Sequence, residues 1–414
     1  MLIEKIKNLA CLNAGNFVEI RHHLHANPEL SYQEFETSKF IQEQMAEYAI
    51  PFTVMAGTGV VGVIKGKNPE SRIVALRADM DALPITERND LPFASKVKVN
   101  YNGQETGVMH ACGHDIHMSA WAGTARIMAE HKDRWRGTLM LVGQPAEETL
   151  SGAVAMLEDG LFTRFPRPNF ALSLHDDDTM PAGTIGYHAG LFRAMSDRVD
   201  ITVYGRGGHA AMPHSTIDPI VLASRIVLSL QTIVSRENNP ADPVVITVGS
   251  IHGGTQGNVI PDEVKLELSV RTLTPQVRTR TLAAIRRVAK GEAEAAGAPR
   301  EPLVTAPAVA PLPVVNDPAL ISRLAGALKT ALGDQNVIEM SAKMTSEDFA
   351  QYGASGVPIA LLHIGAVNRA KLEESRKTGI PVPAPHSPEW APEHEPTLKG
   401  AIRAEVTALL ELLR

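Results

Sequence analysis

Three apolar runs of strand length, at residues 72–78, 138–142 and 170–174, are each followed by side chains that bind metals or move protons. These side chains are, in chain order, Asp79, Asp81, Glu147, Glu148 and His175. In open α/β sheets, ligands bind at the carboxyl ends of the strands. Carboxylates and imidazoles that gather at one such edge are typical of a divalent transition-metal site. We therefore expect a metal site, although each of these residues taken alone would be an ordinary surface or core residue.

The segment from His110 to His117 adds a thiol and further imidazoles just before a predicted helix. Cys112 and His114 have a second interpretation, as the nucleophile and base of an acyl-transfer enzyme. Against this interpretation, no third group that would orient His114 is evident. Anionic neighbours also raise the pKa of a thiol unless a cation offsets them. Because a bound metal would supply that cation, the metal site is the preferred interpretation.

The first half of the chain alternates strand and helix signals. The continuous apolar runs suit strands that are buried on both faces of a helix-covered sheet. Ser31 and Glu34 have the spacing of a capping box, which predicts a helix from there to about Tyr48. Apolar residues at helical spacing predict a second helix from Ile116 to His131. These patterns indicate an α/β domain with a mostly parallel sheet flanked by helices.

Near residue 193 the pattern changes to that of a smaller α+β unit. It predicts, in order, a strand at 198–204, a helix at 218–236, strands at 244–251 and 264–272, a helix at 275–296 and a weak strand at 302–309. This order is that of a ferredoxin-like unit. A proline-rich passage follows, and buried-strand signals return at 357–362. We therefore expect a discontinuous first domain, 1–192 plus 311–414, interrupted by an inserted domain at 193–310.

The composition excludes several classes of protein. Hydrophobic residues make up 44% of the chain and charged residues 21%, which excludes a disordered or fibrous protein. Lysine and arginine total 40 against 46 aspartates and glutamates, so the net charge of −6 gives no electrostatic reason to expect nucleic acid or a membrane as partner. Only two cysteines, Cys11 and Cys112, are present, which excludes a disulfide framework. No apolar signal core, membrane-length run or phosphate-binding loop is evident, so the expected location is the cytoplasm.

The chain resembles the dinuclear metallo-amidohydrolases, a family that includes hippurate hydrolase, aminoacylase-like N-acyl-amino-acid hydrolases and auxin-conjugate hydrolases, with carboxypeptidase G as a more distant relative. The matching stretches are RHHLHANPEL at 21–30, LRADMDALP at 76–84, MHACGHDIH at 109–117, QPAEE at 144–148, GRGGHAAMPH at 205–214, GNVIPD at 257–262, SEDF at 346–349 and HSP at 386–388. They follow the family's order and span nearly the whole chain. The resemblance implies a catalytic α/β domain with an inserted ferredoxin-like lid and dimerisation domain.

The resemblance also implies two divalent metal ions per chain, of Mn, Zn, Co or Ni. The metal ligands implied are Cys112, His114, Glu148, His175 and His386, with the cysteine bridging the two ions. The catalytic residues implied are Glu147 as general base and acid, His209 as the donor that stabilises the oxyanion, and Asp81 as the group that orients a ligand. His209 would act on the active site of the partner subunit in a homodimer, or in a dimer of such dimers. Asn258 and Arg271 would hold the carboxylate of the substrate.

The activity implied is hydrolysis of the amide bond of N-acyl amino acids, whether hippurate-like, N-acetyl or aryl-acyl. Two ions would lower the pKa of a bridging water and polarise the carbonyl, and Glu147 would carry the water's proton to the leaving nitrogen. Arg271 suits a carboxylate because its planar fork binds both oxygens. Two alternatives stay open. One is a dipeptidase or carboxypeptidase acting on small peptides, and the other is a binding homologue without turnover, against which the intact Glu147–Glu148 pair argues.

Some features depart from the family's pattern or leave a choice open. Asp176 to Asp178 follow His175, where relatives carry small, apolar or aromatic residues. These acids would disfavour anionic acyl groups, favour a cationic substrate, or form a solvated loop, and the solvated loop is the preferred interpretation. A polar insertion at 366–385 precedes His386, so His363 competes with it as a metal ligand. Three histidines match the family and are expected to be structural: His22, His23 and His25.

Overall fold

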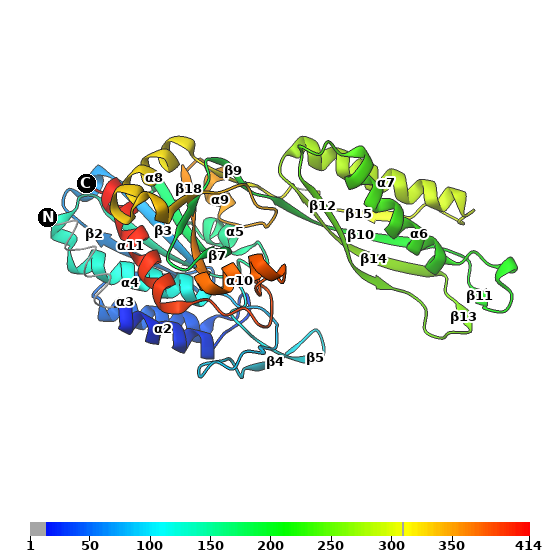
Figure 1. The fold of residues 1–414 in the computed structure, drawn as a ribbon, viewed down its shortest axis with the longest axis horizontal. Coiled ribbons are helices and arrows are strands. Elements are labelled where there is room, and N and C mark those ends of the chain that lie inside the picture. The colour runs from blue at the N-terminus through cyan, green and yellow to red at the C-terminus, as the bar shows by residue number, and fades with distance from the viewer. Residues whose placement is uncertain (1–13, 309) are drawn as a thin grey trace. The chain divides into compact units, whose positions relative to one another are not determined.

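The computed structural model describes residues 14–308 and 310–414, which fall into two compact units (Figure 1). The first unit holds the described residues up to Gly190 together with Val315–Ser341 and Asp348–Arg414. The second unit holds Leu191–Val314 and Ala342–Glu347. Cys11 lies outside the described residues.

A mixed eight-stranded sheet forms the centre of the first unit, in the order β1-β2-β6-β3-β7-β18-β8-β17. Its strands are β1 (Phe52–Met55), β2 (Gly59–Lys65), β3 (Ile73–Asp79), β6 (Thr138–Gln144), β7 (Phe170–Pro181), β8 (Ile185–Tyr187), β17 (Val337–Glu339) and β18 (Ile359–Val367). In the middle of the sheet, β6, β3, β7 and β18 run parallel to one another. Two of them, β6 and β18, are buried at every residue, as strands covered on both faces are. The predicted α/β class is confirmed.

Helices cover this sheet and supply most of the remaining core of the first unit (Figure 1). They are α2 (Ala14–Ala26), α3 (Phe35–Glu47), α4 (His114–Glu130), α5 (Gly152–Glu158), α8 (Pro318–Leu332), α9 (Ala350–Ala354), α10 (Arg369–Thr378) and α11 (His394–Leu412). Helix α4 is buried along nearly its whole length, and the indole of Trp121 donates a hydrogen bond to the carbonyl of Leu76 in β3. A separate hairpin is formed by β4 (Lys98–Tyr101) and β5 (Gln104–Gly107).

The capping box predicted at Ser31 and Glu34 is wrong. Helix α3 begins at Phe35, and its N-cap residue Glu34 makes no capping hydrogen bond through its side chain. Ser31 Oγ instead donates to Asp81 at 2.6 Å. The buried carboxylate of Glu34 accepts hydrogen bonds from Thr58 Oγ1 at 2.7 Å and from the Ala146 main-chain N–H at 2.9 Å. Both side chains therefore bond to residues far away in the sequence. Glu34 holds Ala146 directly, and Ser31 holds Asp81, which bonds the main chain of Glu147.

The second unit is a four-stranded antiparallel sheet with two helices. Its elements are, in chain order, β10 (Met195–Tyr204), α6 (Pro219–Thr232) with a π-helical turn at Ile233–Glu237, β12 (Val244–His252), β14 (Glu263–Thr272), α7 (Pro275–Ala295) and β15 (Leu303–Thr305). The strand order β12-β14-β10-β15 is that of the predicted ferredoxin-like unit. Asp218 caps α6 and Thr274 caps α7, each through its side-chain oxygen.

Short strands extend this sheet or connect the two units. Strands β11 (Gly208–His209) and β13 (Val259–Ile260) pair with each other beyond the ends of β10 and β14. Strands β9 (Gly190–Arg193) and β16 (Val314–Asn316) lie where the chain passes from one unit to the other.

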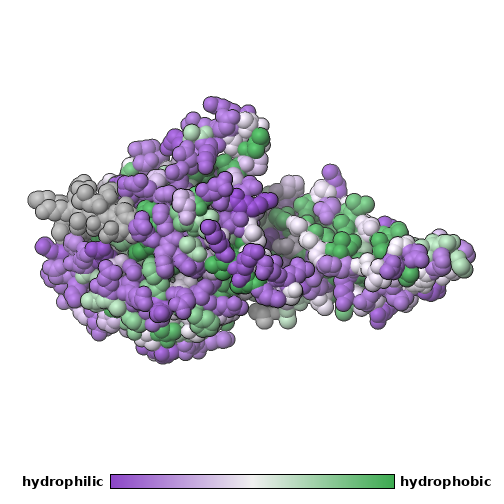
Figure 2. Space-filling view, turned by 90° about the horizontal axis from the view of Figure 1, so that it is seen from below, coloured by the Kyte–Doolittle hydropathy of each residue, from purple (hydrophilic) through white to green (hydrophobic). Residues whose placement is uncertain are grey.

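The second unit exposes apolar side chains on α6 and on the edge strand β12. Leu228 of α6 is 72% exposed and Val221 is 57% exposed, and Val245 and Ile251 of β12 are also exposed. Figure 2 shows apolar atoms gathered on the surface of this unit. The stretch Pro219–Glu237 is long and apolar enough, by length and composition, to cross a membrane, and only 33% of it is buried within the unit. Exposed apolar side chains that gather in this way are typical of surfaces that bind another protein or a membrane.

A carboxylic acid is buried between α4 and α11 in the core of the first unit. Glu405 accepts a hydrogen bond from Thr124 Oγ1 at 2.6 Å, and both residues are buried. Burial raises the pKa of Glu405 to about 8, and the bond from Thr124 offsets only part of that effect. Above this pH the folded protein therefore holds a buried charge, which costs free energy.

Replacing Glu405 by glutamine is expected to stabilise the protein, and to do so more at about pH 9 than at about pH 5. Between the ordinary pKa of 4.5 and about 8, the folded state retains a proton that the unfolded state has lost. The stability that this group contributes is therefore complete at low pH and is lost as the pH rises towards 8. The gain at high pH should be on the order of 1–3 kcal/mol, measured as the free energy of unfolding in urea.

The matched control is Glu395→Gln, which changes an exposed carboxylate in the same helix. This variant should show no gain in stability that grows with pH. An equal gain for Glu405→Gln at both pH values would contradict the account.

Candidate metal centre

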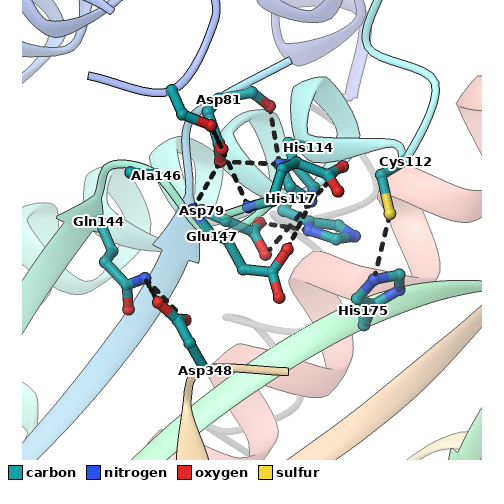
Figure 3. A network of polar contacts seen from close by, with 12 residues as sticks. Asp79, Asp81, Cys112, His114, His117, Gln144, Ala146, Glu147, His175 and Asp348 are labelled. Atoms are coloured by element: carbon teal, nitrogen blue, oxygen red, sulfur yellow. Dashed lines mark hydrogen bonds and ion pairs between the residues drawn. The ribbon is translucent and has the colours of Figure 1, made fainter. Parts of the chain in front are cut away.

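The strands of the first unit bring the predicted site residues to one edge of the sheet. Asp79 at the end of β3 lies beside Gln144 at the end of β6, because the two strands are parallel and in this register. Strand β7 runs along the other side of β3 and carries His175. Figure 3 shows Asp79 and His175 on the same side of the sheet edge as Cys112, His114 and Glu147, whereas the side chain of Gln144 points to Asp348. The predicted gathering of site residues at strand ends is thus present in the fold.

The Cys112–Gly113–His114 loop enters this region just before α4. Gly113 has a φ of +76°, the left-handed conformation that favours glycine. A Cβ atom at Gly113 would also lie 2.3 Å from Asp176 Oδ2, so a side chain does not fit there. The loop places Cys112 Sγ 3.6 Å from His175 Nε2 and makes His114 the first residue of the helix.

Asp81 fixes three of the site residues at once. Its carboxylate accepts hydrogen bonds from the main-chain N–H groups of Glu147 and Glu148, each at 3.0 Å, and from Ser31 at 2.6 Å. Its main-chain carbonyl lies 2.8 Å from His114 Nδ1. Because Nδ1 donates to that carbonyl, Nε2 of His114 faces the cluster and is the nitrogen that a metal could use. Asp81 therefore has the orienting position that was expected of it.

The donor atoms at the centre of the cluster fit a divalent metal. His114 Nε2 and Glu148 Oε1 are buried, have no hydrogen-bond partner and lie 3.9 Å apart. The ligand atoms of Cys112, His114 and His175 lie within 4.8 Å of one another, and so do those of Cys112, Glu148 and His386. Nitrogen, sulfur and oxygen donors in this number are typical of zinc and similar ions. Cys112 belongs to both groups, as a residue shared by two ions would.

Burial opposes ionisation of the acidic members of this cluster. It raises the pKa of Glu148 to about 8, although His114 acts in the opposite direction. Burial and the nearby Glu148 raise the pKa of the Cys112 thiol well above its usual range. On His114, burial lowers the pKa, but Asp79 and the bond with Asp81 outweigh it and raise the pKa well above the usual value. A bound cation would favour the thiolate, the carboxylate and the neutral imidazole, which are the forms that bind metal.

The structure separates the two histidines that competed as the last ligand. His386 Nε2 lies 3.4 Å from Glu148 Oε2, and its main-chain N–H donates to the carbonyl of Ala111 at 2.7 Å. His386 has a φ of 70°, so the backbone is strained where it turns the ring towards the cluster. His363 is buried in β18 and its Nδ1 bonds Asp177 Oδ2 at 2.7 Å. The geometry therefore favours His386 as the ligand.

A buried ionic network behind the cluster was not predicted from the sequence. Arg77 donates to Asp79 Oδ2 at 2.8 Å, to Asp348 Oδ1 at 2.8 Å and to Gln144 Oε1 at 3.0 Å. Gln144 donates in turn to both oxygens of Asp348 (Figure 3). His117 Nδ1 lies 2.5 Å from Asp79 Oδ1. This network fixes the carboxyl ends of β3 and β6.

The charges of the network are mutually stabilising. Burial lowers the pKa of His117, but Asp79 and Asp176 on either side outweigh it and raise that pKa to about 9. Burial raises the pKa of Asp79, but His114, His117 and Arg77 bring it well below its usual range. Two signals in the sequence could have found this network. Its members all lie in the family-like stretches LRADMDALP, MHACGHDIH, QPAEE and SEDF, and His117 follows His114 by three residues on the same face of a helix.

The interpretation of Asp176 to Asp178 as a solvated loop is wrong for the first two residues. All three lie within strand β7, and Asp176 and Asp177 are 2% and 1% exposed. Asp176 contacts His117 and Trp390, and Asp177 contacts His363 and Thr179. The strand continues past the point where its apolar pattern ends because buried histidines and an indole N–H satisfy the carboxylates.

The histidines near the N-terminus lie on helix α2, outside the donor cluster. His25 contacts Asp115 at 2.9 Å and Glu87 at 3.1 Å, and Arg21 donates to the same Asp115 oxygen at 2.9 Å. His22 stacks on Phe93, and His23 on Phe40. Since Asp115 directly follows His114, these contacts join α2 to the start of α4.

The other predicted site residues lie in the second unit, at two separate places. His209 is exposed, and its Nδ1 accepts a hydrogen bond from the Ala211 main-chain N–H at 3.0 Å. Asn258 lies close by, because its carbonyl accepts from the N–H of Ala210 at 3.1 Å. Arg271 is at the opposite end of β14, and eight residues of strand put it roughly 26 Å from that end of the sheet. The unit thus brings Asn258 and His209 together but keeps Arg271 apart from both.

Comparison with known proteins gives relatives that match most of the chain. A thermostable carboxypeptidase 2 from Saccharolobus solfataricus is 36% identical over 355 residues, 85% of this chain and 86% of the relative. An N-acetyl-L-cysteine deacetylase from Bacillus subtilis is 43% identical over 272 residues, 66% of this chain and 62% of the relative. An IAA-amino acid hydrolase ILR1-like 2 from Arabidopsis thaliana is 39% identical over 351 residues, 82% and 74% of the two chains.

Solved structures agree with this grouping. The YXEP protein of Bacillus subtilis, described as a dinuclear metal binding peptidase from the M20 family, has a TM-score of 0.74 at 31% identity and covers 96% of this chain and 99% of its own. A putative aminohydrolase from methicillin-resistant Staphylococcus aureus has a TM-score of 0.80 at 35% identity and covers 100% and 99%. The model of peptidase family M20/M25/M40 matches residues 75–377. The resemblance seen in the sequence is confirmed: the chain belongs to peptidase family M20/M25/M40, a family of amidohydrolases and peptidases.

Proposed function

We propose that this chain hydrolyses the amide bond of N-acyl amino acids and uses two divalent metal ions to do so. The observation that carries the proposal is the buried donor set around Cys112. In that set, His114 Nε2 and Glu148 Oε1 have no hydrogen-bond partner, and Glu147 lies alongside. Membership of the family supports the amide as the bond that is broken.

When bound, two divalent ions would supply Lewis acidity that polarises the amide carbonyl and makes a water molecule more acidic. Glu147 is placed to move the proton, because Asp81 fixes its main chain and its Oε2 lies 4.0 Å from His114 Nε2. Its carboxylate takes a proton from the attacking water and delivers it to the departing nitrogen. The delivery matters because an amide anion is a poor leaving group.

The second unit carries groups suited to the rest of the substrate. The main-chain N–H of Ala211 donates to Nδ1 of His209, so the ring proton is on Nε2, from which it can be donated to an oxyanion. Arg271 donates to the hydroxyls of Ser346 and Ser269 and forms no ion pair with a carboxylate among the described residues. Burial lowers the pKa of Arg271, as expected of a cation that lacks a fixed counter-charge. A substrate carboxylate would provide that counter-charge.

The relatives support an N-acyl amino acid as the substrate class. Two of them are named for acyl derivatives of amino acids, N-acetyl-L-cysteine and the IAA-amino acid conjugates. The carboxypeptidase name of a third relative keeps small peptides as the alternative. Both classes share an amide bond next to a carboxylate, which is the feature that the metal ligands and Arg271 would recognise.

The second unit is further proposed to pair with a second copy of the chain. Strand β12 is a nine-residue edge strand with exposed Val245 and Ile251, and the adjacent helix α6 exposes Leu228 and Val221. A long apolar edge is normally covered, and an antiparallel pair of identical edges satisfies two-fold symmetry. A homodimer also accounts for the separation of Asn258 from Arg271, since one subunit can then supply Arg271 and the other Asn258 and His209.

Glu147→Gln is expected to retain bound metal and to lose at least ~3 orders of magnitude in kcat, because it removes the proton carrier but no metal ligand. Release of free amine from N-acyl amino acids measures the rate, and elemental analysis measures the metal. Glu158→Gln, which alters an exposed glutamate in α5, serves as the control and should behave as wild type. Full activity in chelator-treated, metal-free wild-type protein would refute the proposal.

An N-acetyl amino acid is expected to be hydrolysed faster than the free dipeptide that has the same carboxyl-terminal residue. The comparison of kcat/KM for such matched pairs separates an N-acyl-amino-acid hydrolase from a dipeptidase or carboxypeptidase. Faster turnover of the dipeptides would favour the peptidase alternative. Tight binding of both without release of amine would indicate a binding protein.

Mixed dimers of His209→Ala chains with Glu147→Gln chains are expected to be active, although each variant alone is inactive. If His209 acts on the partner subunit, each mixed dimer has one complete active site, and random pairing restores about a quarter of wild-type activity. The measurement is specific activity after co-refolding or co-expression of the two variants. No recovery would mean that His209 acts on its own chain's active site or has no part in catalysis.

A further inference from the structure

Asp176 is a buried carboxylate that contacts four separate parts of the first unit. Its side chain has no solvent exposure, and it lies in β7 directly after His175. The residues it contacts are His175 itself, Gly113 of the metal-binding loop, His117 of α4 and Trp390. These contacts lie at or near four candidate ligands. His175 is itself one of the contacts, Cys112 and His114 flank Gly113, and His386 lies four residues before Trp390.

The first contact orients His175. His175 Nδ1 lies 2.8 Å from the main-chain carbonyl of Asp176 and 3.2 Å from its Oδ1. Both oxygens accept the Nδ1 proton, so the lone pair of the ring is on Nε2, which faces Cys112 Sγ at 3.6 Å. A metal-binding histidine is typically oriented by this kind of bond from its other nitrogen.

The second contact confines the loop between Cys112 and His114. Asp176 Oδ2 fills the space where a Cβ of Gly113 would lie, 2.3 Å away. In α4, His117 Nε2 lies 2.9 Å from the main-chain nitrogen of Asp176 and 3.1 Å from its Oδ1, and Nδ1 of the same ring contacts Asp79. The loop and the first turn of α4 are thereby held against β7.

The third contact reaches the segment that carries His386. Trp390 Nε1 donates to Asp176 Oδ2 at 3.2 Å, and the indole is 2% exposed. The main-chain N–H of Trp390 donates to the carbonyl of Ser387, the residue after His386. The indole packs with Met109 and Ala111, and Ala111 accepts the hydrogen bond from the main-chain N–H of His386. Asp176 therefore links this segment to the metal-binding loop.

The neighbouring residue provides an internal comparison. Asp177 is buried to the same degree, in the same strand, but bonds His363 at 2.7 Å and Thr179 at 2.5 Å. Side chains two positions apart share a face of a strand, so Asp177 lies on the face of His175, and its partner His363 stacks on the His175 ring with centroids 5.8 Å apart. Asp176, in contrast, contacts the Gly113 loop and the Trp390 indole. The carboxylates of Asp176 and Asp177 are equally buried but bond to different residues.

We propose that Asp176 is a positioning residue for the metal centre. Asp176 holds His175, the Cys112–His114 loop and the His386 segment in the arrangement that binds two ions. The inference rests on the proposed function, because it assumes that the donor cluster is a metal site. It adds a role for a residue of this chain that is not itself a ligand.

The test is a titration of metal-free, full-length protein with Co²⁺, followed by its visible absorption and by the thiolate-to-cobalt band in the near ultraviolet. Wild type should bind two Co²⁺ ions, and Asp176→Asn should bind them about 10- to 100-fold more weakly, with an altered visible spectrum. Asp177→Asn is the matched control and should weaken binding much less than Asp176→Asn, because the bonds of its carboxylate go to His363 and Thr179. Circular dichroism and thermal unfolding establish that each variant is folded.

A wild-type titration curve and spectrum for Asp176→Asn would overturn the inference, and so would an equal weakening by Asp177→Asn. If Asp176→Asn does not fold, Trp390→Phe removes the indole donor to Asp176 together with part of the buried ring, and it should weaken binding in the same direction. Unchanged binding in this variant would overturn the inference. Wild type that binds two Co²⁺ ions but releases no amine from any substrate would refute the proposed function alone. Wild type that binds no Co²⁺ would overturn both.

Discussion

Buried acidic groups without enough fixed positive charge to ionise all of them are the constraint on which the first unit depends. Carboxylates and a thiol converge on one small volume, where burial raises the pKa of Glu148 to about 8 and that of Cys112 well above its usual range. Arg77 and His117 balance Asp79, Asp348 and Asp176, but they do not contact Cys112 or the unpaired oxygen of Glu148. A divalent cation resolves this imbalance, since it stabilises ionised ligands that would otherwise stay protonated.

In this fold, the side chains proposed to bind metal are different from the side chains that keep them in position. The parallel strands bring the ligands and Glu147 to one sheet edge, and Asp81 and Asp176 fix them from behind through main-chain and ring hydrogen bonds. Backbone strain at Ala146 and His386, both in the left-handed region, is tolerated because buried hydrogen bonds hold these residues. The second unit carries His209, Asn258 and Arg271, so under the proposed function substrate recognition would come from a different part of the chain from the metal ligands.

Features that depend on a local pattern of residues, such as buried strands, could be predicted from the sequence. Hydrogen bonds between residues that are distant along the chain could not. Continuous apolar runs identified β6 and β18, because strands covered on both faces have no polar alternation. The capping box failed because Ser31 and Glu34 have better partners 50 and 112 residues away. The solvated loop expected at Asp176 is wrong because its carboxylate is buried against distant partners, among them Trp390, 214 residues further on. Resemblance to the family supplied the proposed ligand set but left His363 competing with His386, and the geometry of the site favours His386.

The central claim is that the donor cluster around Cys112 is a centre for two metal ions. Anomalous X-ray diffraction from crystals of the purified protein, collected on both sides of the absorption edge of the metal found by elemental analysis, tests it most directly. The account predicts two anomalous peaks, both in contact with Cys112 Sγ, with the remaining ligands drawn from His114, Glu148, His175 and His386. Peaks that leave Cys112 without a metal, or protein that holds no metal and still hydrolyses its substrate, would contradict the account.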